Sequence, residues 1–299
     1  IDDALALLLL AAAPELDLMA ITVTHGNTSQ DKCLANALKL VELLGITQVP
    51  VARGAQEPLV KELSVAEETH GDGGLGYAVL PDAKLRPVQE PAHDLIIRLV
   101  NENPNQITLL CVGPMTNIAL AFLKQPEIAK KVKRIVAMGG SIHYPGNSTP
   151  QSEYNVFCDP EAYDVVINAG IDFTLVPLDV TYQCLLTNQH IEQITEARPE
   201  IKSFIKESTR FYIEFHAEYQ GIQGCAINDP LAAAILIDPT LVENKEYFLS
   251  IDLSGGPSKA KTIADHYGAL NKAPNSQVSM AVDVDRFMKL FIERMNRLS

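Results

Sequence analysis

Short apolar runs alternate with longer amphipathic stretches along the 299 residues, and this alternation most restricts the possible fold. The runs predict buried strands at residues 16–24, 49–51, 107–112, 134–138 and 172–176, and later strands at 247–251 and 278–282. Helices are predicted at residues 2–13, 29–44, 91–101, 159–168, 201–219, 229–237 and 285–298. This order favours a single α/β domain over residues 1–299, with a doubly wound, mainly parallel (mixed) sheet flanked by helices.

The charge balance argues against polyanionic partners. With 24 basic and 37 acidic side chains, the formal charge is -13, so a nucleic acid or an anionic membrane would be repelled. No run approaches the roughly 18 apolar residues that a membrane span requires. The five cysteines form no C-x-x-C pair and are expected to be reduced thiols in a cytoplasmic protein.

The loop after the predicted strand at 134–138 holds the densest group of polar candidates. It contains Asn147, Glu153, Tyr154 and Asn155. Because such a loop starts at the carboxyl end of a parallel strand, its side chains would face the crevice in which α/β proteins bind ligands. Two amides and a carboxylate suit a polyhydroxylated ligand. The same composition is typical of plain turns, and the residues alone leave both interpretations open.

Three acidic residues begin predicted helices. Asp2 and Asp3 are adjacent, and Asp229 lies far away in the chain. Acids in the first turn of a helix are common because they interact favourably with the helix dipole. The alternative is a hard-cation site, in which carboxylates and a main-chain carbonyl bind calcium or magnesium. No local calcium-loop spacing is present, so spacing alone does not decide between the two.

Two histidines are further candidates. His70 lies in a glycine-rich stretch within an irregular region at 54–90, which is expected to pass over the site, and we expect its side chain to be exposed and mobile. His216 follows Tyr212 by four residues on one helix face, a spacing that is typical of a buried core as well as of a binding site. No serine-hydrolase elbow, phosphate loop or dinucleotide turn occurs.

Six motifs, taken in order, resemble those of the inosine-uridine preferring nucleoside hydrolases. They are Ile1-Asp2-Asp3-Ala4, the VGPMTNIA stretch at 112–119, Met138-Gly139-Gly140, Asn147 with Glu153-Tyr154-Asn155, Asp159-Pro160-Glu161-Ala162 and Asn228-Asp229-Pro230. The resemblance covers essentially the whole chain. It implies a calcium-dependent enzyme that hydrolyses the N-glycosidic bond of purine or pyrimidine ribonucleosides, small-molecule substrates, to ribose and free base. It also implies a homodimer or homotetramer.

The resemblance assigns roles residue by residue. Asp3, Asp229 and the main-chain oxygen of Val112 are expected to bind calcium, which would lower the pKa of the attacking water. Catalytic roles are implied for Asp2 and Asn155. The expected substrate-binding residues are Asp2, Asn27, His70, Met138, Asn147, Glu153, Tyr154, Asn155, Tyr212, His216 and Asn228. Carboxylates and amides among them would stabilise an oxocarbenium-like transition state.

Two departures from the family pattern shape these expectations. The family has a first strand and a D-x-D-P-G turn, with the general-base aspartate, before the position of Ile1, and we expect the intact protein to have them. Asn228 stands where many members have a histidine that assists the leaving base, and an amide cannot deliver a proton as an imidazolium can. We hypothesise that His216, which falls where relatives have a tyrosine facing the base, protonates the leaving group.

Two other functions are considered. One is a catalytically impaired nucleoside- or ribose-binding homologue, which the missing aspartate and Asn228 would suggest. The other is a metal-independent α/β enzyme that acts on a different sugar. Neither the preferred base nor the choice between dimer and tetramer is predicted from the residues.

Overall fold

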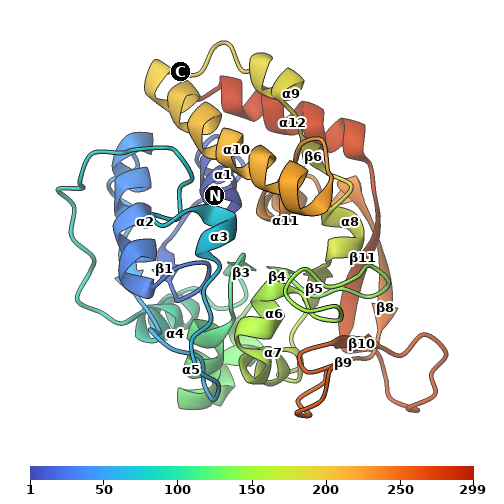
Figure 1. Ribbon diagram of the computed structural model, residues 1–299. Helices are drawn as coiled ribbons and strands as arrows, with labels where there is room; N and C mark the ends of the chain where they lie inside the picture. The colour runs from blue at the N-terminus through green and yellow to red at the C-terminus, as the bar shows by residue number, and fades with distance from the viewer.

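A mixed sheet of five strands lies at the centre of the computed structural model, which describes residues 1–299 (Figure 1). The strand order is β3 (Thr108–Cys111), β4 (Arg134–Met138), β5 (Phe173–Val176), β11 (Ser276–Val282) and β8 (Val242–Tyr247). The first four strands are parallel, and β8 pairs antiparallel with β11. The predicted α/β class with a mainly parallel sheet is therefore confirmed.

Three strand pairs and two sets of helices complete the fold. The pairs are β1 (Ile21–Val23) with β2 (Val51–Arg53), β9 (Leu249–Ile251) with β10 (Thr262–Ala264), and β6 (Leu185–Leu186) with β7 (Cys225–Ala226). The helices are α1 (Asp2–Ala11), α2 (Gln30–Leu44), α3 (Glu67–His70), α4 (Ala92–Glu102), α5 (Thr116–Lys124), α6 (Tyr154–Cys158), α7 (Pro160–Ile167), α8 (Leu178–Thr181), α9 (Asn188–Glu192), α10 (Pro199–Gln220), α11 (Asn228–Ile237) and α12 (Val284–Asn296). Two 3-10 helices are η1 (Pro126–Lys131) and η2 (Pro239–Leu241). None of the helices has the length and apolar character that crossing a membrane requires.

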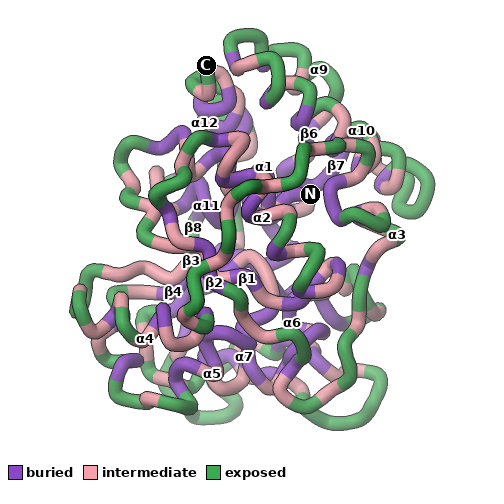
Figure 2. Tube along the Cα trace, turned by 90° about the vertical axis from the view of Figure 1, so that its left-hand side faces the viewer, coloured by how far each residue is buried: buried purple, intermediate pink, exposed green.

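Strand β4 shows how one apolar run serves two cores. Ile135 and Ala137 belong to a core shared with α5 and α7, whereas Val136 and Met138 belong to a core shared with α1, α11 and α12. Successive side chains of a strand point to opposite faces of the sheet, so a strand that helices cover on both faces must be apolar throughout. Figure 1 shows the two helix layers, with α4, α5 and α7 on one side and α10, α11 and α12 on the other. In Figure 2 the buried positions follow the strands and the inner helices, and the exposed positions follow the outer loops.

The pair β1–β2 is not hydrogen-bonded to the five-stranded sheet. The facing strands β1 and β3 line a mainly apolar cavity of about 750 Å³, together with residues of α1. The strand predicted at 16–24 is therefore shorter than expected. Only Ile21–Val23 is a strand, because its parallel pairing with β2 extends over three residues.

Two other predictions concern the later chain and the irregular region. The strand predicted at 247–251 is wrong as a single element, since β8 ends at Tyr247 to pair with β11 and β9 begins at Leu249 to pair with β10. The irregular course of residues 54–90 is confirmed, with the short helix α3 inside it and one isolated bridge between Ala52 and Val88. This region carries α3 to the cavity described next.

Candidate active site

A second cavity, of about 300 Å³, opens beyond the carboxyl ends of the parallel strands. Met138 is the last residue of β4, and Val112 directly follows β3. The cavity is lined by the predicted site residues Asp2, Asn27, His70, Val112, Met138, Asn147, Glu153, Tyr154, Asn155, Tyr212, His216, Asn228 and Asp229. Asp3 alone of the predicted set does not line it, although its side chain lies beside Asp2 and Asp229. The position agrees with the rule that open α/β sheets bind ligands at the carboxyl ends of their strands.

The three predicted acids converge although Asp229 is more than 200 residues from the other two. Carboxylate oxygens of Asp2, Asp3 and Asp229 all lie within 4.8 Å of one another. Helices α1 and α11 pack together and bring their first turns to the same point. Asn27 donates a hydrogen bond to Asp3 at 3.4 Å. The first-turn placement that suits the helix dipole therefore also builds a cluster of oxygen ligands.

Burial and neighbouring negative charges disfavour the ionised forms of Asp3 and Asp229. Burial, followed by the charges of Asp2 and Asp3, raises the pKa of Asp229 well above its ordinary value. The pKa of Asp3 is raised to about 6, chiefly by desolvation and also by the charge of Asp2. The Asp3 side chain keeps 46% of its surface accessible, but that surface faces a concave wall where protein atoms displace bulk water. Adjacent carboxylates with oxygen-only donors suit a hard divalent cation, whose charge would offset this cost.

The loop after β4 forms the opposite wall. Glu153 accepts hydrogen bonds from the main-chain nitrogens of Gly140 (2.9 Å), Asn155 (2.8 Å) and Val156 (3.1 Å). Burial outweighs these bonds and raises the pKa of Glu153 to about 7. Gly140 has φ +71°, and a Cβ on Gly139 would lie 2.4 Å from the Tyr163 hydroxyl, so both positions require glycine. The glycine pair therefore allows the loop to turn sharply into the cavity.

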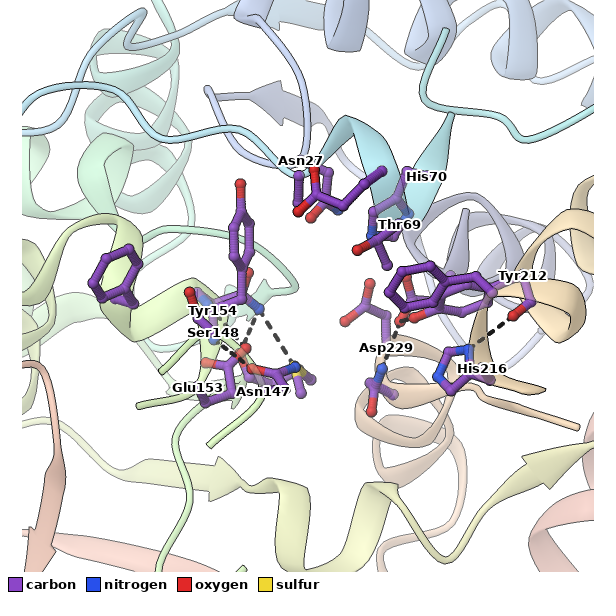
Figure 3. Close-up of a pocket in the computed structure, with 18 of the residues that line it drawn as sticks. Asn27, Thr69, His70, Asn147, Ser148, Glu153, Tyr154, Tyr212, His216 and Asp229 are labelled. Atoms are coloured by element: carbon purple, nitrogen blue, oxygen red, sulfur yellow. Dashed lines mark hydrogen bonds between the residues drawn. The ribbon is translucent and has the colours of Figure 1, made fainter. Parts of the chain in front are cut away.

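The two asparagines of this loop are also oriented by hydrogen bonds. Asn155 donates from Nδ2 to the main-chain oxygens of Met138 (3.2 Å) and Val112 (3.3 Å). Asn147 accepts from the main-chain nitrogen of Tyr154 at 2.9 Å. The Tyr154 hydroxyl has one proton to donate and lies 2.8 Å from the main-chain oxygen of Gly26 and 3.1 Å from that of Ser64, so it connects the loop to the irregular region. In Figure 3, Asn147, Glu153 and Tyr154 face Asp229, Tyr212 and His216 across the cavity.

The expectation that the His70 side chain is exposed is wrong. Its side chain is buried at 5% exposure, with Nδ1 3.1 Å from the main-chain nitrogen of Ile1 and the ring 5.4 Å from that of Tyr212. The prediction failed because contacts from α1 and α10, distant in sequence, enclose a stretch whose glycines indicate mobility. An N–H donates to Nδ1, so the neutral ring carries its proton on Nε2. His70 therefore presents a donor, and burial holds its pKa well below the ordinary value.

His216 has the opposite tautomer. Its Nδ1 lies 2.8 Å from the main-chain oxygen of Tyr212, which can only accept, so Nδ1 carries the proton and Nε2 has a free lone pair. The side chain is 2% exposed and lines the cavity. Burial lowers the pKa of His216, against the opposing influence of the Tyr212 carbonyl and of Asp2. The place of His216 in the cavity wall therefore supports the binding-site interpretation of this helix face, and its burial also agrees with the core interpretation.

Several cavity residues were not predicted from the sequence. They are Ser64, Val65, Ala66, Glu68, Thr69, Ser148, Phe157, Tyr182, Phe215 and Gln220. Gln220 follows His216 by four residues on the same helix face and donates to the Tyr182 hydroxyl at 3.3 Å, so helical spacing could have identified it. Tyr182 follows β5 and α8, and its place after a parallel strand was the available signal.

Comparisons with known proteins agree with this geometry. The family described as inosine-uridine preferring nucleoside hydrolase matches residues 1–289. The chain is 35% identical to the pyrimidine-specific ribonucleoside hydrolase RihA of Enterobacter sp. (strain 638), over 100% of this chain and 95% of that protein. A solved purine-preferring ribonucleoside hydrolase from Gardnerella vaginalis has a TM-score of 0.94 and 35% identity, covering 99% of this chain and 95% of that one.

A plant nucleoside hydrolase, PpNRh1, has a TM-score of 0.93 and 31% identity over 99% of this chain and 95% of its own. The family match and these likenesses each extend over nearly the whole sequence. The chain belongs to the inosine-uridine preferring nucleoside hydrolase family.

Proposed function

We propose that this protein hydrolyses the N-glycosidic bond of purine or pyrimidine ribonucleosides, or of both, with calcium as its metal ion, and releases ribose and the free base. The observation that carries the proposal is the convergence of three acids: Asp2 and Asp229 line one wall of a cavity whose opposite wall holds Glu153 and Asn155, and Asp3 lies beside them. Acids on one side and oriented amides on the other suit a sugar with neighbouring hydroxyls and a cationic transition state.

The donor set fits calcium. Asp3, Asp229 and the main-chain oxygen of Val112 would hold the ion, and all three donors are oxygens. The carboxylates lie within 4.8 Å of each other, a separation that one cation can bridge. When bound, calcium would lower the pKa of a water molecule and help to hold the ribose hydroxyls.

The protein side chains would then fix the sugar. Asp2 and the Oδ1 atom of Asn155 would accept hydrogen bonds from ribose hydroxyls, and Asn147 and Glu153 would bind the remainder of the sugar. Because Glu153 is held by three main-chain N–H groups, little of its freedom is lost on binding. Met138, Tyr154 and Asn27 complete the walls around the ring.

His70, Tyr212 and His216 form the base end of the cavity in this proposal. Their rings are consecutive neighbours, with centroids 5.4 Å and 4.4 Å apart. His216, protonated on both nitrogens, would give the Nε2 proton to the departing base, while its Nδ1–H stays on the Tyr212 carbonyl. His70 would donate a hydrogen bond to the base from Nε2.

The base preference stays open between purines and pyrimidines. A pyrimidine-specific relative and a purine-preferring one are each 35% identical to this chain. Purine and pyrimidine ribonucleosides share the ribose and differ in the base. The preference for one base must therefore depend on the base end of the cavity, where His70, His216 and Gln220 lie.

The proposal includes a homodimer or homotetramer that serves nucleobase salvage in the cytoplasm, as the family resemblance implies. All five cysteines are free thiols, which agrees with a reducing compartment. Sedimentation of the purified protein would distinguish the two assemblies.

The test is the release of reducing sugar and free base from a panel of purine and pyrimidine ribonucleosides. Release from at least one member supports hydrolysis, and the ranking gives the base preference. The alternative, a nucleoside- or ribose-binding homologue, predicts that nucleosides raise the melting temperature without being consumed. An Asp229→Asn variant, which lacks one expected metal ligand, should lose the release.

A further inference from the structure

The side chain of Asn228 bonds to Asp2 rather than to its own helix. Helix α11 begins at Asn228, and its N-cap, Ile227, makes no side-chain capping bond. Asn228 Nδ2 donates to Asp2 Oδ2 at 2.9 Å and to the main-chain oxygen of Ala226 at 3.4 Å. Asn228 and Asp2 lie 226 residues apart in the chain, so the stronger bond is a tertiary contact inside the cavity wall.

The amide orientation is fixed by its neighbour. If the amide were reversed, Oδ1 would face the carboxylate of Asp2, and two acceptors would repel each other. In the observed orientation Oδ1 is buried without a hydrogen-bond partner. The bond from Asn228 Nδ2 to the Asp2 carboxylate stabilises the fold, whereas the unpaired buried acceptor Oδ1 destabilises it. The contact with Asp2 is therefore what the amide contributes to the cavity wall.

Asp2 has two hydrogen-bond partners, Asn228 and Tyr212. Both are neutral donors, and both bond to the same carboxylate oxygen of Asp2. The Tyr212 hydroxyl lies 3.5 Å from Asp2 Oδ2, the oxygen that also accepts from Asn228. This arrangement leaves Asp2 Oδ1 available to a substrate hydroxyl. Since neither donor carries a charge, the carboxylate is oriented without losing the negative charge that a cationic transition state requires.

We propose that Asn228 is a positioning residue that holds Asp2 Oδ1 toward a hydroxyl of the ribose. This role rests on the proposed function, in which Asp2 binds the sugar. It differs from the expectation that Asn228 itself contacts the substrate, because the nitrogen is engaged by Asp2 and the oxygen is enclosed in protein.

The test compares Asn228→Leu with the unsubstituted full-length protein. Leucine has a similar shape and removes both the donor and the unpaired acceptor. We expect kcat/KM for a ribonucleoside to fall about 10- to 100-fold, the range found when a group that orients a site ligand is lost. The melting temperature should change little, because the variant loses both the bond to Asp2 and the unpaired acceptor, which act in opposite directions. Ribose should raise the melting temperature of the unsubstituted protein more than that of the variant.

Two further variants keep the test decisive. Asn228→Asp preserves the shape but places an acceptor against Asp2, so it should lose activity even if Asn228→Leu fails to fold. Thr262→Val is the matched control, because Thr262 Oγ1 is also buried without a partner but lies in β10, outside the cavity. It should keep the unsubstituted kcat/KM.

The outcomes separate the role of Asn228 from the proposed function. If Asn228→Leu or Asn228→Asp retains the unsubstituted kcat/KM, the positioning role is wrong and nucleoside hydrolysis stands. A lower melting temperature for Asn228→Leu with full activity would assign Asn228 to the fold alone. If the unsubstituted protein hydrolyses no nucleoside, the proposed function is wrong, and the role of Asn228 with it.

Discussion

His216 Nδ1 lies 2.8 Å from the main-chain oxygen of Tyr212, one helical turn earlier in α10. Because a carbonyl only accepts, this bond fixes the proton on Nδ1 and leaves Nε2 as the atom that can exchange a proton with a ligand. The neutral ring cannot donate from Nε2, so the proposed protonation of a leaving base requires the imidazolium form.

His216→Ala is expected to slow hydrolysis of inosine or uridine about 10²- to 10⁴-fold, the usual contribution of a general acid. The same variant should hydrolyse p-nitrophenyl riboside nearly as fast as the unsubstituted protein, since that leaving group departs without a proton. Steady-state rates on both substrates measure the difference. Equal losses on the two substrates would reject the role of His216.

The pH dependence of hydrolysis should depend on the leaving group. Burial lowers the pKa of His216, and the Tyr212 carbonyl and the charge of Asp2 oppose this shift. The rings of Tyr182 and Tyr212 pack against the His216 ring. His70 is the other histidine nearby. The protonated form exists below this lowered pKa and is lost as pH rises through it. The kcat/KM for inosine should therefore fall with rising pH below neutrality, and that for p-nitrophenyl riboside should lack this limb. Parallel profiles would contradict the assignment.

Glu153 should make the fold less stable at neutral and alkaline pH. Its pKa is raised from 4.5 to about 7, so the neutral form is preferred in the folded state. The stability that comes from burying neutral Glu153 is fully present below the pKa of this residue in the unfolded chain. It is lost as the pH rises through the folded-state pKa of about 7. The loss is on the order of 3 kcal/mol, because each pKa unit corresponds to about 1.4 kcal/mol.

Urea unfolding at about pH 5 and about pH 8 measures this loss. The difference in unfolding free energy between the two pH values should be smaller in Glu153→Gln, whose side chain does not ionise. An unchanged difference would show that the burial of Glu153 has no such effect.

Asp229→Asn should stabilise the protein when divalent cations are absent. Removing one of three carboxylates within 4.8 Å relieves a repulsion of roughly 1 to 4 kcal/mol. The variant should also lose the rise in melting temperature that calcium gives the unsubstituted protein. Asp17→Asn, at an exposed position, is the control and should keep that rise. A full calcium response in Asp229→Asn would remove this residue from the metal site.

Local sequence patterns predicted the fold class, and the family resemblance named most of the residues that line the candidate site. The run at Arg134–Met138 is apolar at every central position, which a strand covered on both faces requires, and the loop after it contains Glu153 and Asn155 as expected. The motifs of the resemblance identified Asp2 and Asp229, whose convergence depends on the packing of α1 against α11.

Features that depend on distant contacts were not predictable. The burial of His70 comes from Ile1 and Tyr212, 69 and 142 positions away, whereas its own neighbours are glycines that indicate a mobile loop. The bond from Asn228 to Asp2 joins two helix starts that no local pattern relates. The shortened strand β1 has the same cause, because the length of a strand depends on its partners as well as on its own residues.

The proposed function depends on carboxylates from two distant parts of the chain, Asp3 near its start and Asp229, that hold a divalent cation. The most direct measurement is ribose release by the full-length protein from its best nucleoside substrate, first as purified, then after chelation, and then after calcium is added back. Release should stop on chelation and return when calcium is added. Release that continues unchanged in the chelator would contradict this proposal.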